Sequence, residues 1–176
     1  IGYGGAKWSM TNLVSNTGVV GSDVTGVGTG RSYLAACSYG DDKGIFAYGQ
    51  SGSNVAVSNK VSNAGVVADD TAGVGTARRY LAACEYGEDK GIFGYGYSDT
   101  ELSMTNLVSN VGVIGTDVTG VGTARSYIAA CSYGDDKGIF GYGKGYTAVT
   151  NLVSNVGVVT DDVAGVGTVR GFVGAT

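Results

Sequence analysis

The sequence predicts an all-β fold, a four-bladed β-propeller closed by pairing of its N- and C-terminal strands, with about four short strands in each blade. Three observations lead to this prediction. The chain of 176 residues contains 33 Gly and no Pro, which favours many short strands joined by tight turns. A motif recurs at a period of about 45 residues, and the two ends of the chain fit together as parts of one repeat.

The repeat is marked by an arginine that precedes a strand of small apolar residues. Arg31, Arg78 and Arg125 follow one another at intervals of 47 residues, and a degenerate fourth copy begins 45 residues later at Arg170. A period in the range of roughly 20 to 50 residues is typical of repeat architectures. We therefore expect residues 1–176 to form one propeller domain of four repeats.

Each full repeat is expected to hold a hairpin followed by two further extended runs. In the copy that starts at Arg78, residues 80–86 and 92–96 predict the two strands of the hairpin. Residues 102–109 and 113–121 predict the third and fourth strands. The first strand carries Ala-Ala-Cys, and such small side chains fit the crowded axis of a small ring.

The ends of the chain predict that the ring closes. Residues 1–4 align with residues 46–49, and only eight positions of the repeat, a hairpin tip, are missing between the C-terminus and the N-terminus. We expect the last blade to be shared between residues 1–27 and 170–176, with residues 1–4 pairing with residues 170–175. Closure would leave no exposed sheet edge at either end.

The order of motifs within each repeat is similar to that of a known repeat family. Arg31 precedes a small-apolar strand, Asp42 and Lys43 form a turn, and the return strand ends at Tyr48-Gly49. In this order the sequence resembles kelch repeats, with Tyr-Gly in place of the family's paired Gly and without its late Trp. The longer phrase from Thr-Asn-Leu-Val-Ser-Asn to Asp-Lys-Gly-Ile-Phe-Gly-Tyr-Gly resembles arrays in bacteriophage, other viral and bacterial virion-type proteins. The resemblance implies a propeller with a structural or receptor-facing role.

Composition excludes several function classes. The net charge of −4 and the lack of a basic cluster argue against nucleic acid as a partner, and no apolar run approaches the roughly 20 residues that span a bilayer. The sequence has no His, which removes copper radical chemistry, His-based nucleophile systems and His-based zinc sites. We expect no cofactor, no metal and no membrane insertion. Because the chain begins at Ile1 and not at Met, we expect a processed form or a piece of a longer protein.

Two sets of repeated residues could form binding sites or could serve only to stabilise the fold. Cys37, Cys84 and Cys131 suit either a three-thiolate metal site or small buried side chains, and we expect the second, with reduced and unliganded thiols, because no Cys-X-X-Cys spacing exists. A carboxylate also recurs eight residues before each repeated arginine, at Asp23, Asp70, Asp117 and Asp162. One interpretation is a ring of carboxylates that binds a cation, or a cluster of arginines that binds an anionic sugar. We expect Asp–Arg pairs or turn bonds instead, and we expect the Asp-Lys turns to be solvated hairpin tips.

The loops after each Tyr-Gly strand differ between repeats, whereas their surroundings do not. Exposed aromatic residues beside amide and charged groups are typical of glycan or peptide surfaces. The candidate ligand-binding residues are Lys7, Trp8, Gln50, Asn54, Tyr97, Asp99, Glu101, Lys144 and Tyr146. The alternative is loop drift, with aromatic rings that pack on the blade edge.

These observations predict a non-enzymatic binding or structural module, virion-associated or at a cell surface, that recognises a glycan or a protein such as a neighbouring virion subunit. A virion or extracellular location is favoured over the cytoplasm. The alternatives are a carboxylate-based glycan hydrolase or lyase, and an engineered or excerpted repeat scaffold with no ligand.

Overall fold

The computed structural model describes residues 7–174, and these residues form an all-β fold. Eleven strands build four small sheets, and two very short strands, β5 and β6, form a separate hairpin. The strands are β1 (Thr11–Val14), β2 (Val20–Val24), β3 (Ala35–Tyr39), β4 (Lys43–Ala47), β5 (Gln50–Ser51), β6 (Ser53–Asn54), β7 (Ser58–Val61), β8 (Ala82–Tyr86), β9 (Lys90–Ser98), β10 (Thr100–Val108), β11 (Ala129–Tyr133), β12 (Lys137–Gly141) and β13 (Thr150–Val153). No helix occurs among the described residues, so none there is long and apolar enough to cross a membrane.

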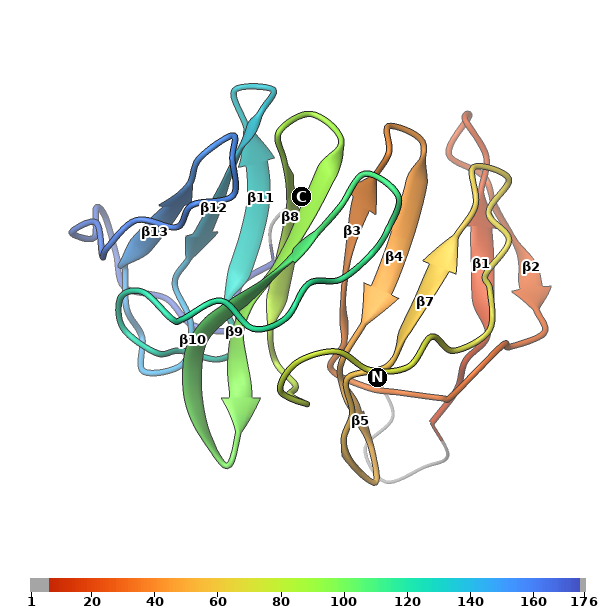
Figure 1. The fold of residues 1–176 in the computed structure, drawn as a ribbon, viewed down its shortest axis with the longest axis horizontal. Helices are drawn as coiled ribbons and strands as arrows, with labels where there is room; N and C mark the ends of the chain where they lie inside the picture. The colour runs from red at the N-terminus through yellow and green to blue at the C-terminus, as the bar shows by residue number, and fades with distance from the viewer. Residues whose placement is uncertain (1–6, 175–176) are drawn as a thin grey trace.

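Three of the sheets have the same antiparallel arrangement, one for each full repeat. Their strand orders are β3-β4-β7, β8-β9-β10 and β11-β12-β13, and the first sheet holds β1 and β2 alone. Figure 1 shows the sheets side by side, with β3, β8 and β11 nearest the middle and with β2 and β13 toward opposite sides. β8 contacts both β3 and β11. The inner strands of the three repeats therefore meet one another.

The inner hairpins form where a run of small residues, Ala-Ala-Cys in β3, β8 and β11, pairs with a return strand that begins Lys-Gly-Ile-Phe. In β8, Ala82, Cys84 and Tyr86 are buried and the residues between them are half-buried, which is the period of two expected for a strand. The register is the same in every copy, with Cys84 opposite Ile92 as Cys37 is opposite Ile45. Sequence patterning thus placed these strands correctly.

The predicted fourth strand of the repeat is shorter than expected. Residues 113–121 do not form a continuous strand, and they join β10 through two isolated bridges, Thr105 to Val118 and Val108 to Ile114. Gly115 and Gly120 interrupt this segment, and glycine weakens a strand because it offers no side chain for packing. The segment nevertheless runs beside β10, as residues 66–71 run beside β7.

The core lies between neighbouring repeats. One cluster joins Tyr48 and Ile45 of the second sheet to Phe93 and Val108 of the third, and a similar cluster joins the third sheet to the fourth. Glycine is required at these contacts. A Cβ atom on Gly91 would lie 2.5 Å from the Cys37 Sγ atom, so the thiol of one repeat packs directly on the backbone of the next.

The predicted closure of the ring rests partly on residues outside the described part of the chain. Residues 1–4 and Ala175 lie there, so their pairing is not described. Within the described range, Arg170 forms a bridge to Thr147 of the preceding repeat. The described residues therefore establish an all-β fold with four small sheets, without a closed ring among them.

Candidate functional site

Before each of the inner strands β3, β8 and β11, a threonine donates two hydrogen bonds to an aspartate carboxylate; we call this arrangement a latch. The Thr76 backbone N–H and hydroxyl both donate to the Asp117 carboxylate, with the hydroxyl 2.7 Å from Oδ2, and Asn106 Nδ2 donates to Oδ1 at 2.9 Å. The same latch, defined as a Thr donating twice to an Asp carboxylate, joins Thr29 to Asp70 and Thr123 to Asp162. The carboxylates are thus occupied by protein donors.

The latch also changes the acidity of its carboxyl group. Burial acts to raise the pKa of Asp117, but the hydrogen bonds donated by Thr76 and Asn106 outweigh it, and the pKa lies below its ordinary value. Asp70 and Asp162 behave in the same way. These groups stay ionised at neutral pH and do not suit a general acid.

The repeated arginines clamp one repeat to the next. Arg78 is fully buried, its Nε donates to the Tyr95 carbonyl at 2.9 Å, and its guanidinium lies 4.1 Å from the centre of the Tyr48 ring. Its Nη1 lies 4.0 Å from the Asp117 carboxylate. The Asp–Arg pairing expected from the sequence therefore exists, although the partner of Arg78 is Asp117 and not Asp70, the carboxylate eight residues before it.

The three cysteines are free thiols in the middle of the array. Cys84 is buried, and Cys37 and Cys131 are half-buried. Burial raises the pKa of Cys84 to about 12 and also raises that of Cys37, so both remain protonated thiols at neutral pH. No group of three metal-ligating side chains occurs among the residues described. Of the three, Cys84 alone is buried as the sequence predicted, whereas Cys37 and Cys131 are half-buried because they border a cavity between the inner strands.

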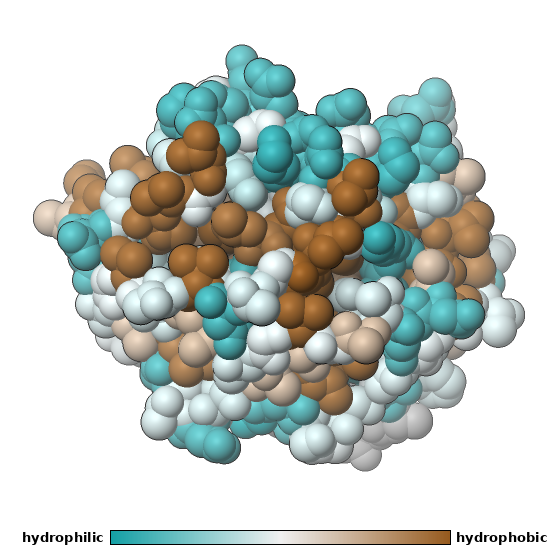
Figure 2. Space-filling view, viewed as in Figure 1, coloured by the Kyte–Doolittle hydropathy of each residue, from teal (hydrophilic) through white to brown (hydrophobic). Residues whose placement is uncertain are grey.

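The hairpin tips are charged and also connect neighbouring repeats. Each tip lysine pairs with the aspartate before it, as Lys90 does with Asp89 at 2.8 Å. Figure 2 shows hydrophilic residues gathered along the edge where these turns lie. In addition, Gly40 N–H donates to the Asp89 carbonyl at 2.7 Å and Gly87 N–H to the Asp136 carbonyl at 2.8 Å. The tips are thus solvated, as expected, and have a structural role that the sequence did not reveal.

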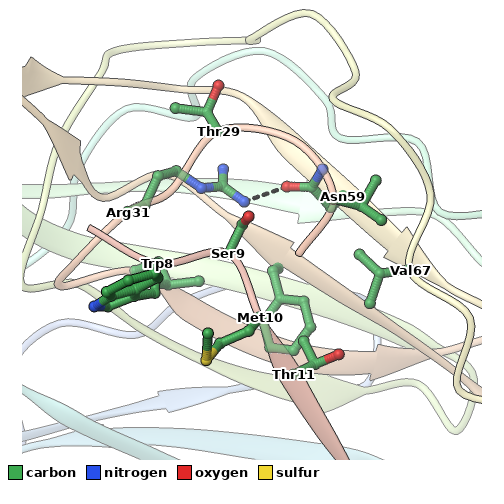
Figure 3. Close-up of a pocket in the computed structure, with 11 residues that line it drawn as sticks. Trp8, Ser9, Met10, Thr11, Thr29, Arg31, Asn59 and Val67 are labelled. Carbon is green, nitrogen blue, oxygen red and sulfur yellow. Dashed lines mark hydrogen bonds between the residues drawn. The ribbon is translucent and has the colours of Figure 1, made fainter. Parts of the chain in front are cut away.

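Trp8 lies beside a cavity of about 320 Å³ between the first two sheets (Figure 3). Arg31 and Phe46 line this cavity, and they correspond to the Arg78 and Phe93 that enclose the Tyr48 ring at the next interface. The residue equivalent to Tyr48 in the first repeat is Tyr3, which lies outside the described residues. The cavity therefore occupies a packing position of the repeat, and its lining does not by itself indicate a ligand.

Four of the predicted ligand-binding residues meet at the opposite edge from the hairpin tips, near the β9–β10 turn (Figure 1). Arg79 and Glu101 are the direct cross-strand neighbours of Tyr97 on its two sides, so the three side chains stand in one row. Asn54 accepts a 2.8 Å hydrogen bond from Arg79 Nη1, and Lys144 lies 3.1 Å from Glu101. Residues from three consecutive repeats thus form one cluster.

A cavity of about 200 Å³, which we call the Arg79 pocket, opens beside this row. It is lined by Arg79, Tyr80, Tyr97, Ser126, Tyr127 and Lys144. The rings of Tyr80 and Tyr127 are stacked, with centroids 3.9 Å apart, and the Arg79 guanidinium lies 5.1 Å from the Tyr97 ring centre. The pocket therefore combines aromatic walls with two cations.

Several buried polar atoms around the Arg79 pocket have no hydrogen-bond partner. They are Arg79 Nε, Glu101 Oε2 and Ser126 Oγ, and Ser126 is only 1% exposed. Buried polar groups without partners are uncommon and call for an explanation. A bound ligand with both donors and acceptors provides one.

The other predicted ligand-binding residues divide into two sets. Asp99 forms the β9–β10 turn and is exposed, and Gln50 pairs with Asn54 across the β5–β6 hairpin, so both adjoin the cluster. Trp8 and Tyr146 are 68% and 64% exposed and Lys7 is exposed, and none of these three lines the Arg79 pocket. Sequence reasoning missed Arg79 altogether. The signal was present, since the equivalent positions are Ser32, Ser126 and Gly171, and only this repeat has a charge there.

Comparison with protein-family models finds no match to this chain, and comparison with curated proteins finds no significant relative.

Proposed function

We propose that the four repeats close into a four-bladed propeller of the kelch type. Three latches are formed, and the halves of a fourth are present in the described residues: Asp23 with its partner Asn12, and the Gly167-Thr168 segment. Gly28, Gly75 and Gly122 each contact the Asp of a latch, whereas Gly167 has no described residue within 4 Å of an added Cβ atom. Joining Thr168 to Asp23 would complete the ring by the interaction that the other repeats already use.

Matched substitutions at a formed and an unformed latch test closure. Thr76→Ala removes one hydroxyl donor to a carboxylate and should lower the free energy of unfolding by about 1–2 kcal/mol. In a closed ring Thr168→Ala should have a similar effect, because Thr168 then binds Asp23. Denaturant unfolding in which Thr168→Ala is neutral while Thr76→Ala destabilises the protein would refute closure.

For the function, the proposal is a non-enzymatic recognition module, virion-associated or at a cell surface, that binds a glycan or a protein surface at the Arg79 pocket. The observation that carries it is the gathering of residues that break the repeat. Arg79, Tyr97 and Lys144 differ from the residues at the equivalent positions of the other copies, and they meet around one cavity. Residues free of the blade's structural requirements are those in which specificity resides.

A glycan array with the full chain tests this proposal. We expect retention of a restricted set of glycans without turnover, and loss of that retention in Tyr97→Ala. The control is Trp8→Ala, which changes an equally prominent aromatic residue away from the cluster. Release of shortened products would instead support the hydrolase or lyase alternative. An array with no retained glycan would leave a protein surface as the ligand, to be tested by a direct pull-down that compares the same two variants.

A further inference from the structure

The Arg79 pocket has an uncompensated positive charge. The lysines of the hairpin tips pair with neighbouring aspartates, and Arg78 and Arg125 lie next to latch carboxylates. Arg79 forms no ion pair with any described carboxylate, and its hydrogen bond to a side chain goes to the neutral Asn54 amide. A half-buried guanidinium with only neutral partners favours an anionic group beside it.

The second cation of the pocket adds to this preference. Lys144 comes from the next repeat. Its Nζ atom lies 5.8 Å from the Tyr97 ring centre and forms an ion pair with Glu101. The residues that line the pocket include two cations and no carboxylate, with Glu101 and Asp99 on the adjoining turn, on a chain whose net charge is −4. The positive character is therefore local, and not a property of the whole surface.

The remaining groups distinguish among anionic ligands. Glu101, the cross-strand neighbour of Tyr97, lies beside the pocket and would repel a second carboxylate. Tyr80, Tyr97 and Tyr127 provide apolar ring surface, and Ser126 offers an unpaired hydroxyl. A ligand with one acid group, several hydroxyls and an apolar ring face satisfies all of these partners.

On this basis we infer that the Arg79 pocket binds one acidic sugar residue, whose carboxylate lies between Arg79 and Lys144 and whose apolar ring face packs against the tyrosine rings of the lining. This inference rests on the proposed function and narrows its ligand. The cavity of about 200 Å³ is smaller than the roughly 300–1,000 Å³ that enclose drug-sized molecules. Its size suits a single sugar residue, with the rest of the glycan outside.

The experiment compares matched neutral and acidic sugars on the full chain. Methyl glucuronide and methyl glucoside, with the corresponding galacturonide and galactoside, are titrated by protein-observed NMR or calorimetry. We expect at least one uronide to bind about tenfold or more tightly than its neutral partner, with affinity falling as salt rises. Arg79→Ser, which introduces the residue of two other repeats, should abolish that difference and leave the melting temperature nearly unchanged.

The matched control is Lys43→Ser, which removes the same charge at a hairpin tip and should leave uronide binding intact. Equal binding of neutral and acidic sugars, insensitive to Arg79→Ser, would overturn the inference while leaving glycan recognition in place. Tighter binding of a polyglutamate peptide than of any uronide would also overturn it, in favour of an acidic protein ligand. Absence of all binding, together with a blank array, would overturn the inference, and a pull-down that also finds no protein ligand would count against the proposed function.

Discussion

Arg78 and Arg79 are adjacent in the chain and differ in almost every physical respect. Arg78 is fully buried, recurs in each repeat, and lies against Tyr48 and the Asp117 latch. Arg79 is half-buried, occurs in one repeat only, and bonds to a neutral amide at the rim of a cavity. A residue that recurs in every repeat is thus held by packing between repeats, whereas a residue that departs from the repeat can differ without loss of that packing.

The largest expected effect comes from removing the buried member of this pair. Arg78→Ala would take away the donor to the Tyr95 carbonyl, the contact with the Tyr48 ring and the charge beside Asp117. We expect a loss of about 3 kcal/mol or more in the free energy of unfolding, measured by denaturant titration. Arg79→Ser is the neighbouring control, and a similar loss in that variant would erase the distinction between the two arginines.

Acid should weaken the latches. The pKa values of Asp70, Asp117 and Asp162 are lowered by folding, so their contribution is fully present above the unfolded-state value near about 4 and is lost as pH falls through the folded values. Melting temperatures measured from pH 6 down to pH 2 should therefore decline mainly below about pH 4. Asp117→Asn should be less stable at pH 6 and show a shallower decline, and an equally steep decline would contradict this assignment.

Thiol chemistry provides a test that does not depend on any ligand. Burial raises the pKa of Cys84 to about 12, and the thiolate is the reactive form. Labelling by a maleimide at pH 7.5 should be slow for Cys84 in the native protein and fast in denaturant, with Cys131 as the half-buried comparison. Rapid native labelling of Cys84 would mean that the contact between β8 and the next sheet opens readily.

The smallest effect is expected at the exposed aromatic residue outside the cluster. Trp8 is 68% exposed and stands beside the cavity between the first two sheets. Trp8→Ala should change the free energy of unfolding by less than about 0.5 kcal/mol, as is usual for surface substitutions, and should not alter glycan retention. A loss of retention in Trp8→Ala, with Tyr97→Ala unaffected, would move the binding site from the Arg79 pocket to the first repeat.

The sequence by itself determined the repeat, the inner hairpins and the all-β class, because period, alternation and turn residues are local properties of the chain. It also pointed to Asn54, Tyr97, Glu101 and Lys144, since loops that vary between repeats stand out in self-comparison. It did not predict that the fourth extended run would form only isolated bridges. How far a glycine weakens strand pairing depends on the side chains that the neighbouring strand places against it.

Only the tertiary structure decided which residues meet. Asp117 belongs with Arg78, 39 residues away, because the sheet register brings residues 114–118 beside β10 and next to the segment before β8. Arg79 joins Tyr97 and Glu101 because three strands align at one register, and Lys144 reaches them from the following repeat. Such contacts depend on how repeats are placed against one another. That placement is set by packing between sheets, which no local pattern in the chain encodes.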